Sequence, residues 1–311
     1  MAGVVTVFGC GGFLGRYVAQ HLYKSGTRVR VAERDPRRAY FLKPMSAVGQ
    51  TQFAAVDLTD AARVTQVVAG SSAVINLVGI LKGDFDAVHV EGARNIAAAA
   101  RAAGASALVQ VSAIGADPDS GSDYGRSKGE GELAVRKAFP GATIIRPSIM
   151  FGPEDQFINR FAGMARLLPV LPVVRPSVKL QPVFVGDVGK AVALAALDPK
   201  THGGKTYELG GPQVLSMHEL IAWICETTER HPTLIDLPDP VGKTIAALTG
   251  WAPGAPITWD QWLMLQKDNV VSDKARDLKA FGISAKPLAA VAEGWLTQYR
   301  RHGRFAAKPS I

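Results

Sequence analysis

Cysteine is scarce in this chain: Cys10 and Cys225 are the two among 311 residues. Two cysteines cannot build a disulfide framework, so a small disulfide-stapled fold is excluded and a reducing compartment is indicated. The apolar stretch 67–81 includes two serines and an asparagine, and it is too short and too polar to cross a bilayer. No basic segment precedes an apolar one as in a secretory signal. We therefore expect neither a membrane span nor a targeting segment.

Signatures of metal and nucleic-acid binding are also missing. The six histidines are scattered, and His218-Glu219 starts like a zinc-protease helix but has Ala222 in place of the second histidine. The sequence has neither aromatic-interleaved basic strands nor a helix-turn-helix pattern. We therefore expect no metal and no nucleic acid.

The chain nevertheless carries a net charge of +8. Its basic residues crowd two places, which are the segment 28–38 and the C-terminal group Arg300, Arg301, Arg304 and Lys308. An anionic cofactor or an anionic membrane surface fits these clusters better than DNA does. A merely solvated basic surface is the alternative.

Apolar runs that read as strands alternate with amphipathic helices through the first half of the chain. The expected strands cover residues 4–8, 28–33, 52–56, 73–78, 107–112 and 143–146, and the expected helices include 13–24 and 88–103. Buried strands separated by helices form a parallel sheet with helices on both faces. The expected fold class is therefore α/β, with a doubly wound parallel (Rossmann) sheet.

The second half of the sequence is less regular. We expect a strand at 183–185, a helix at 187–197 with Asp187 as N-cap, a helix at 217–230 opened by a capping box from Ser216 to Glu219, and an irregular proline-rich connection at 231–256. The whole pattern predicts two domains. A dinucleotide-binding domain covers 1–150, with 181–200 returning to it, and a smaller, loop-rich domain for docking or substrate covers 151–311.

The turn after the first strand is rich in glycine, with Gly9, Gly12 and Gly15 at three-residue spacing. Positions without side chains let the backbone approach phosphates, and the start of the following helix offers N–H groups and a positive dipole end. The spacing by itself is a weak signal, which the strand before it and the helix after it strengthen. The residues that we predict to bind a dinucleotide pyrophosphate here are Gly9, Gly11, Gly12, Phe13, Leu14 and Gly15. Cys10 is interpreted as a small filler in the turn.

The end of the second strand gives two conflicting signals about the cofactor. Glu33 stands where an acid would bind the ribose diol of NAD, whereas Arg34, Arg37 and Arg38 offer guanidinium groups that suit a 2′-phosphate. Three arginines outweigh one acid, so NADP(H) is favoured and NAD(H) is the alternative.

Further cofactor contacts are expected at the ends of later strands. We predict that Asp57 and Leu58 flank the adenine, that Val78 and Gly79 cover the ribose, and that Pro147 and Ser148 border the nicotinamide.

Tyr124 and Lys128 are four residues apart, so on a helix the lysine ammonium lies beside the phenol. Its charge favours phenolate and brings the tyrosine pKa closer to the range of proton transfer. Ser112 ends the fifth expected strand, on the edge where doubly wound sheets bind ligands. Ser112, Tyr124 and Lys128 resemble the triad of the short-chain dehydrogenase/reductase superfamily. The loop between Ser112 and Tyr124 is much shorter than in sugar-nucleotide epimerases of that superfamily, so the triad looks retained and the substrate pocket altered.

Several longer stretches resemble one branch of that superfamily, the NADPH-binding accessory subunit of respiratory complex I, which is called alpha subcomplex subunit nine in mitochondria. The stretches that carry the resemblance are 74–81, 89–95, 111–118, 146–161, 181–187 and 268–272. The segments 151–161 and 268–272 are the most specific. Glu33 departs from the family, which generally lacks an acid there.

The resemblance implies an extended dehydrogenase fold that holds NADPH tightly and has no established turnover. It also implies contacts with other complex I subunits near the junction of the peripheral and membrane arms. The expected location is therefore the cytoplasmic face of the bacterial inner membrane, which corresponds to the matrix side in mitochondria. The five tryptophans all lie at or beyond Trp223, and Trp251, Trp259 and Trp262 surround a proline-rich loop, which favours a contact surface over simple core filling.

Two classes of function remain open from the sequence. The first is a structural or assembly subunit of the membrane-bound NADH:ubiquinone oxidoreductase with NADP(H) as a stabilising ligand. The second is a free oxidoreductase, epimerase or dehydratase that acts on a nucleotide-sugar or a small carbonyl compound. In the second class Tyr124 is the acid/base, Ser112 polarises the substrate oxygen and Lys128 tunes Tyr124.

Overall fold

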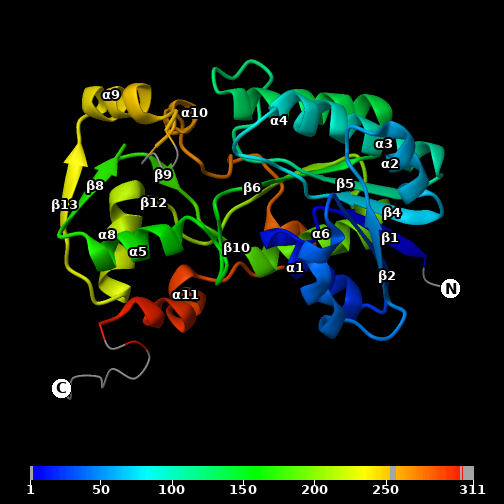
Figure 1. Ribbon diagram of the computed structural model, residues 1–311, viewed down its shortest axis with the longest axis horizontal. Helices are drawn as coiled ribbons and strands as arrows, with labels where there is room; N and C mark the ends of the chain where they lie inside the picture. Colours follow the sequence, from blue (N-terminus) through cyan, green and yellow to red (C-terminus); the bar gives the residue numbers. More distant parts are fainter. Residues whose placement is uncertain (1–2, 253–256, 302, 304–311) are drawn as a thin grey trace. The chain divides into compact units, whose positions relative to one another are not determined.

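The computed structural model describes residues 3–252, 257–301 and 303 of the chain (Figure 1). These residues form two compact units. The first unit consists of the residues up to Pro147 together with Val185–Leu209 and Val271–Ser284, and the second consists of Ser148–Phe184, Gly210–Val270 and the residues from Ala285 onward. The sequence pattern had assigned a shorter returning segment, 181–200, and gave no sign of the second return at 271–284.

The first unit is built on a seven-stranded sheet with the order β11-β6-β5-β4-β1-β2-β3. Its strands are β1 (Val4–Phe8), β2 (Arg28–Glu33), β3 (Thr51–Ala55), β4 (Ser71–Asn76), β5 (Ala107–Val111), β6 (Thr143–Pro147) and β11 (Thr206–Leu209). Every neighbouring pair is parallel. The predicted doubly wound parallel sheet is confirmed, with β11 as an edge strand that the sequence pattern did not indicate. Strands β1 to β3 are added toward one edge of the sheet and β4 to β6 toward the other, so the strand order reverses between β1 and β4. Sheets of this kind bind ligands at that point.

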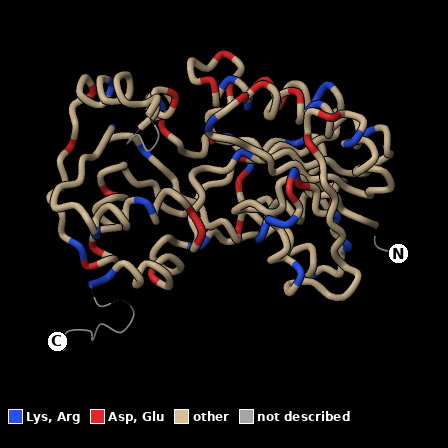
Figure 2. Tube along the Cα trace, in the orientation of Figure 1, with Lys and Arg blue, Asp and Glu red and all other residues tan. Residues whose placement is uncertain are grey.

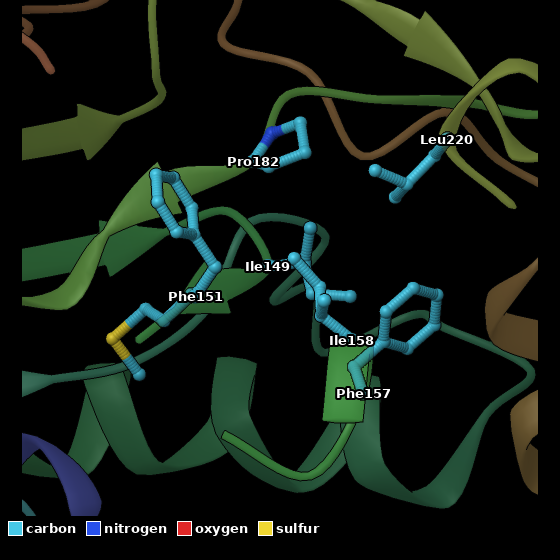
Figure 3. A pocket seen from close by; sticks show the side chains of 7 residues that line it. Ile149, Phe151, Phe157, Ile158, Pro182 and Leu220 are labelled. Atoms are coloured by element: carbon cyan, nitrogen blue, oxygen red, sulfur yellow. The ribbon is translucent and has the colours of Figure 1, made fainter. Parts of the chain in front are cut away.

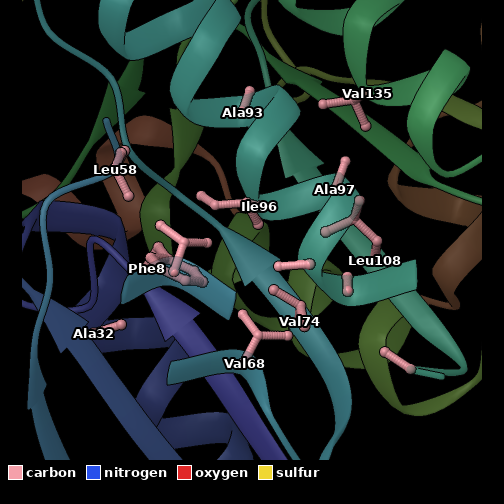
Figure 4. Packing of buried hydrophobic residues seen from close by; sticks show 14 of the residues in the cluster. Phe8, Ala32, Leu58, Val68, Val74, Ala93, Ile96, Ala97, Leu108 and Val135 are labelled. Carbon is pink, nitrogen blue, oxygen red and sulfur yellow. The ribbon is translucent and has the colours of Figure 1, made fainter. Parts of the chain in front are cut away.

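Helices cover both faces of this sheet. They are α1 (Phe13–Lys24), η1 (Pro36–Met45), α2 (Ala61–Val68), η2 (Asp86–Gly92), α3 (Ala93–Ala102), α4 (Asp123–Ala138), α6 (Val185–Leu197), α7 (Pro199–His202) and η3 (Leu278–Phe281). Figure 1 shows α2, α3 and α4 on one face of the sheet and α1 with α6 on the other. On the first face, Phe8, Val74 and Leu108 of the sheet pack against Ile96 of α3 and Val135 of α4 (Figure 4). This apolar layer fixes the strands whose carboxyl ends carry the candidate site.

Two expected elements of the first unit differ in detail. The predicted helix 88–103 begins earlier, as the π-helical turn η2, and continues as α3. The helix predicted from 187 begins at Val185, so Asp187 lies in the first turn of α6 and is not its N-cap. A carboxylate in the first turn still interacts with the positive end of the helix dipole. Asp187 therefore marks the start of the helix, as predicted, but the helix begins two residues before it.

The second unit has three small two-stranded sheets. They pair β7 (Met150–Phe151) with β10 (Val183–Phe184), β8 (Val170–Val174) with β13 (Thr233–Leu237), and β9 (Lys179–Leu180) with β12 (Leu215–Ser216). Its helices are α5 (Ile158–Leu167), α8 (Met217–Thr227), α9 (Asp239–Thr249), α10 (Trp259–Met264), α11 (Leu288–Leu296) and η4 (Thr297–Tyr299). The predicted capping box is confirmed at the start of α8, where Ser216 and Glu219 each bond the other's backbone N–H.

The proline-rich segment 231–256 is not an irregular connection. It contains β13 and α9, and its prolines start the helix, with Pro238 at the N-cap and Pro240 in the first turn. Proline is tolerated there because the first N–H groups of a helix have no intrahelical partner. Residues 253–256 of this segment lie outside the described residues.

The tryptophans divide between core and surface. Trp262 is buried against α9 in a small cluster with Ala246 and Ile257, and Trp295 packs in the main core of the second unit. Trp251 is 80% exposed and Trp259 is 42% exposed. Trp262 and Trp295 therefore belong to apolar cores, whereas a contact surface formed by the exposed Trp251 and Trp259 stays a prediction.

Figure 2 shows acidic and basic residues interspersed along the helices of both units. Arg300 pairs with Glu229, whereas Arg304 and Lys308 lie outside the described residues. None of the helices in the described ranges combines the length and apolar character needed to cross a membrane.

Candidate nucleotide-binding site

The glycine turn closes tightly between β1 and α1. Gly9 has a φ of +79°, a conformation that favours glycine, and a Cβ there would lie 3.1 Å from Val78. A Cβ on Gly15 would lie 2.3 Å from the carbonyl oxygen of Cys10. Gly12 is the N-cap of α1 and supplies no capping side chain, so the first N–H groups of α1 are available to an anion.

Cys10 lies buried in this turn, with its Sγ 3.7 Å from the carbonyl oxygen of Gly15. Burial raises the pKa of its thiol, and the nearby Glu33 raises it further. A thiol held protonated in this way is unreactive, so Cys10 acts as a small filler.

Glu33, at the end of β2, lies over the glycine turn. Its Oε1 accepts the backbone N–H of Gly11 at 2.5 Å. Burial raises the pKa of this carboxyl, while the Gly11 N–H and the charges of Arg34 and Arg38 lower it. The acid therefore lies at the turn itself, within the electrostatic range of two of the three predicted arginines.

The third arginine is directed elsewhere. Arg37 donates two hydrogen bonds to Asp35, at 2.8 and 3.1 Å, and Asp35 also caps η1. Arg34, directly after β2, and Arg38, in η1, are both exposed. Of the three arginines, Arg34 and Arg38 are therefore the two whose charges act on Glu33.

The two residues predicted to flank the adenine behave differently. Asp57 is exposed, and the N–H and hydroxyl of Thr59, which donate to its carboxylate, lower the pKa of that carboxyl, as does the charge of Arg34. Leu58 is 8% exposed and packs into the core, where a Cβ on Gly92 would lie 2.9 Å from its own Cβ. The Leu58 side chain therefore packs in the core beside Gly92, at the junction of η2 and α3.

The loop after β4 lies against the lysine of the triad. The N–H of Val78 donates to the side chain of Asn76 at 3.0 Å, which turns the loop over the end of the strand. A Cβ on Gly79 would lie 3.0 Å from Nζ of Lys128. The missing side chain thus leaves room for the ammonium group.

Ser112 follows β5 and is 4% exposed. Its N–H donates to the carbonyl of Ile145 at 2.7 Å, which fixes the residue to β6. Its hydroxyl is buried and has no hydrogen-bond partner among the described residues. A buried hydroxyl without a partner carries an unrecovered desolvation penalty, which a bound molecule can remove by accepting a hydrogen bond from it.

Tyr124 and Lys128 lie on the first half of α4, whose N-cap Ser122 accepts the N–H of Gly125. Lys128 is 5% exposed, and its Nζ is 5.8 Å from the centre of the Tyr124 ring. Burial lowers the pKa of Lys128 to about 8, and Glu132 partly opposes this shift. The lysine is thus a buried cation beside the phenol, which is the arrangement that the spacing predicted.

The sequence gave no indication of a further group, His89 with Phe85, beside Tyr124. The His89 ring stacks on Phe85 with centroids 5.5 Å apart and meets the Tyr124 ring edge to face at 5.6 Å. His89 Nε2 accepts the N–H of Ile80, so its Nδ1 carries the proton and donates to Ser127 at 2.9 Å. His89 lies in a π-helical turn, a feature that recurs at functional sites but is visible only in the structure.

His89 is neutral in this environment. Burial lowers its pKa to about 3, and the charge of Lys128 adds to the effect. Through Ser127, whose hydroxyl donates to the Tyr124 carbonyl at 3.0 Å, the imidazole ties the loop after β4 to the start of α4. It packs against the Tyr124 ring and does not titrate near neutral pH.

Pro147 and Ser148, predicted to border the nicotinamide, lie on either side of the boundary between the units. The Pro147 carbonyl accepts the N–H of Ile114 at 3.1 Å within the first unit. In the second unit the Ser148 hydroxyl donates to the Asn269 side chain at 2.6 Å. The Ser148 hydroxyl is therefore already engaged by a residue of the 268–272 segment.

The second unit has its own small cavity, with apolar walls that include Ile149, Phe157 and Leu220 (Figure 3). None of the residues predicted to bind the cofactor lines it. No cluster of three or more His, Cys, Asp or Glu residues that could hold a metal occurs in the described part of the chain.

These features fit a bound dinucleotide. The turn at 9–15 is a cradle that side chains would fill, the start of α1 presents N–H groups, and the Ser112 hydroxyl lacks a partner. The model of the NAD dependent epimerase/dehydratase family matches residues 5–210. The chain belongs to this family. A member of it, with this cradle, is an NAD(P)(H)-binding protein with a Rossmann fold.

This family member has relatives in both function classes. It is 35% identical to the Arabidopsis thaliana protein named NADH dehydrogenase [ubiquinone] 1 alpha subcomplex subunit 9, mitochondrial, over 96% of this chain and 79% of that protein. It is 33% identical to a protein of Caulobacter vibrioides named ceramide reductase, over 79% of this chain and 77% of that protein.

Among solved structures, an NADPH-dependent quinone oxidoreductase of Escherichia coli in complex with NADPH matches with a TM-score of 0.76 and 20% identity, over 94% of this chain and 99% of that one. At this identity the match shows the shared fold.

The arrangement of Ser112, Tyr124 and Lys128 defines what this family member can do chemically. A bound NAD(P)(H) supplies or accepts a hydride. The Tyr124 hydroxyl can give a proton to, or take one from, an oxygen, and the charged Lys128 favours its phenolate form. The Ser112 hydroxyl, which has no partner among the described residues, can donate a hydrogen bond to a bound molecule.

Proposed function

We propose that this protein is an NADP(H)-binding accessory subunit of the membrane-bound NADH:ubiquinone oxidoreductase, respiratory complex I, and that the nucleotide is a stabilising ligand. The observation that carries the proposal is the similarity to the plant complex I subunit over 96% of this chain, which includes both units. A ligand that binds only the folded state stabilises it as its concentration exceeds the dissociation constant. Bound nucleotide would therefore hold the first unit folded while other surfaces contact the complex.

The cofactor preference proposed is NADP(H). Arg34 and Arg38 act on the Glu33 carboxyl, so both guanidinium groups lie near the place where a 2′-phosphate would approach. A carboxylate and a phosphate repel each other, but two cations around one acid leave a net positive site. We expect NADPH to raise the melting temperature more than NADH does, and the double variant Arg34→Ala, Arg38→Ala to lose that difference. An equal or larger effect of NADH on the unaltered protein contradicts the preference.

The proposed location is peripheral, on the cytoplasmic face of the bacterial inner membrane, near the junction of the two arms of complex I. Exposed apolar side chains support a contact surface in the second unit. Leu248 is 68% exposed and Trp251 is 80% exposed, at the end of α9. Apolar side chains of this size favour association with a partner or a membrane boundary.

The decisive experiment is affinity purification of the tagged full chain from detergent-solubilised membranes of its source. Co-elution with iron–sulfur polypeptides and NADH:quinone oxidoreductase activity is the expected result. A chain that elutes without them, from membranes that contain intact complex I, overturns the assignment. The variant Leu248→Ser, Trp251→Ser tests the surface, because it should fold normally and lose co-elution.

The second candidate is a free NAD(P)-dependent oxidoreductase or epimerase/dehydratase. The Ser112 hydroxyl without a partner among the described residues and the buried Lys128 beside Tyr124 favour it, as does the relative named ceramide reductase. Stoichiometric oxidation of NADPH by a carbonyl compound or nucleotide-sugar, lost in Tyr124→Phe, would establish it. Absence of turnover with the complex co-eluting leaves the first proposal standing.

A further inference from the structure

The buried face of α4 carries three ionisable side chains in a row. Tyr124, Lys128 and Glu132 follow at four-residue spacing, so they lie one above another on one face of the helix. Lys128 is 5% exposed and Glu132 is 6% exposed. Tyr124 and Lys128 belong to the predicted nucleotide site, whereas Glu132 lies one helical turn beyond it.

Glu132 is fixed by a residue of β6. Arg146 donates to both of its carboxylate oxygens, at 2.8 and 2.7 Å. A further nitrogen of Arg146 lies 3.6 Å from a carboxylate oxygen of Glu208 on β11. Glu208 in turn accepts the N–H and the hydroxyl of Ser272, at 2.9 and 2.7 Å. All these residues belong to the first unit.

The charges along this chain of contacts alternate in sign from Lys128 through Glu132 and Arg146 to Glu208. Buried ions are expensive to desolvate, and removal of one member leaves its neighbour with an unbalanced charge. The other ionisable groups around Lys128 are the neutral His89 of η2 and the phenol of Tyr124, so neither supplies a negative charge at neutral pH. The carboxylate that acts on Lys128 is that of Glu132.

We propose that Glu132 is a positioning residue of the nucleotide site: fixed by Arg146, its carboxylate balances the Lys128 ammonium and keeps it charged against Gly79. The proposal rests on the NAD(P)(H) site described above and assigns a function to an acid one helical turn behind the triad. Its first test needs no nucleotide, so it can fail separately from the nucleotide site.

The first test follows the ¹³Cε resonance of Lys128 with pH in the full-length, lysine-labelled protein, with the resonance assigned by its loss in Lys128→Arg. Glu132→Gln should lower the titration midpoint by at least about one pH unit, because a buried negative charge one turn away is removed. Arg146→Gln should raise the midpoint, because the carboxylate loses its competing cation. Glu130→Gln is the matched control on the exposed side of α4, where Glu130 lies 3.8 Å from Arg126, and it should leave the midpoint unchanged.

The second test measures NADPH affinity at two pH values. Glu132→Gln should bind about five-fold more weakly than the unaltered protein at pH 8 and equally well at pH 6, where Lys128 is charged in both. A purely structural role would weaken binding at both pH values.

An unmoved Lys128 midpoint in Glu132→Gln overturns the proposal. If Glu132→Gln does not fold, the Arg146→Gln variant tests the proposal instead, because it should raise the titration midpoint of Lys128. A midpoint that is unchanged or lower in Arg146→Gln also overturns the proposal. Failure of the unaltered protein to bind any NAD(P)(H) would instead contradict the nucleotide site. The titration of Lys128 would still test whether Glu132 acts on it, because that measurement needs no nucleotide.

Discussion

At the scale of single residues, Ser112 buries a hydroxyl without a hydrogen-bond partner among the described residues, and Lys128 buries an ammonium whose desolvation Glu132 offsets only in part. The Ser112 hydroxyl has no hydrogen-bond partner within the described residues, and Lys128 is a cation with 5% exposure. Such groups lower the stability of the nucleotide-free fold. Both residues therefore indicate a site in which a bound molecule supplies the missing hydrogen-bond partner or further charge compensation. Both also give predictions that can be tested without a known substrate.

Ser112→Ala should leave the free energy of unfolding unchanged or raise it by up to about 1 kcal/mol, because the lost hydroxyl made no hydrogen bond. Ser122→Ala is the matched control: Ser122 is also buried but caps α4, so its loss should cost about 1 kcal/mol. Urea unfolding of the nucleotide-free protein measures both. A Ser112→Ala variant as destabilised as Ser122→Ala would mean that the hydroxyl has a structural partner.

Lys128→Met should stabilise the nucleotide-free protein at pH 7 by about 1 to 3 kcal/mol, because the desolvation of the ammonium outweighs its attraction to Glu132, and Glu132 keeps Arg146 as its partner. The pKa of Lys128 is lowered from 10.5 to about 8 in the folded protein, so between these values the unfolded chain holds a proton that the folded one has released. The contribution of this residue to the free energy of unfolding therefore rises with pH from about 8 to 10.5. Below pH 8 the folded protein holds the buried charge, and the destabilisation is complete.

The measurement is urea unfolding at several pH values across that window. Lys128→Met should abolish this part of the rise, whereas Lys137→Met, at an exposed position on the same helix, should retain it. Destabilisation of the Lys128→Met variant at pH 7 would show that Glu132 compensates the desolvation of Lys128 in full.

At the scale of elements, the strand–turn–helix at the start of the chain is constrained by how closely its parts approach. A Cβ at Gly15 would lie 2.3 Å from a backbone oxygen of Cys10, so α1 can follow β1 this tightly only with glycine there. The same substitution has the opposite effect in an open helix position. Gly163 lies within α5, and a Cβ there meets nothing within 4 Å.

We therefore expect Gly15→Ala to lower the free energy of unfolding by about 3 kcal/mol or more and to abolish NADPH binding. Gly163→Ala should raise stability by up to about 1 kcal/mol, since alanine has the higher helix propensity, and should leave NADPH binding unchanged. Thermal unfolding with and without NADPH measures both effects. Normal NADPH affinity in a folded Gly15→Ala variant would place the nucleotide elsewhere.

At the scale of the whole molecule, the two units have separate apolar cores, one under the seven-stranded sheet and one around Leu171, Ile221 and Leu288. All five tryptophans belong to the second unit, the first of them being Trp223. Tryptophan fluorescence therefore reports the second unit, whereas far-UV circular dichroism reports mostly the larger first one. This division makes the two units separately observable.

Saturating NADPH, at about a hundred times its dissociation constant, should add about 2.7 kcal/mol to the stability of the unit that binds it. Because most predicted contacts lie in the first unit, the urea transition seen by circular dichroism should move to higher urea. The tryptophan transition should stay in place. Equal movement of both transitions would show that the units unfold together or share the ligand.

The local features of this protein could be predicted from its sequence. The alternation of strands and helices, the glycine turn at 9–15, the shared helix face of Tyr124 and Lys128 and the capping box at Ser216 all depend on residues close together in the chain. Their geometry follows from the periods of helices and strands and from backbone sterics. For this reason the fold class and the edge of the sheet that carries the site were accessible without coordinates.

Only the tertiary structure decided which distant residues complete the site. Glu33 bonds Gly11, Arg146 joins Glu132 to Glu208, and the segment 271–284 returns to the first unit, although no local pattern marks these contacts. The orientation of His89, and the exposure that separates Trp251 from Trp262, were equally hidden. The burial of a side chain and its pairing with distant residues depend on how the whole chain packs. A short stretch of sequence determines the period of a helix or strand, but it does not determine that packing.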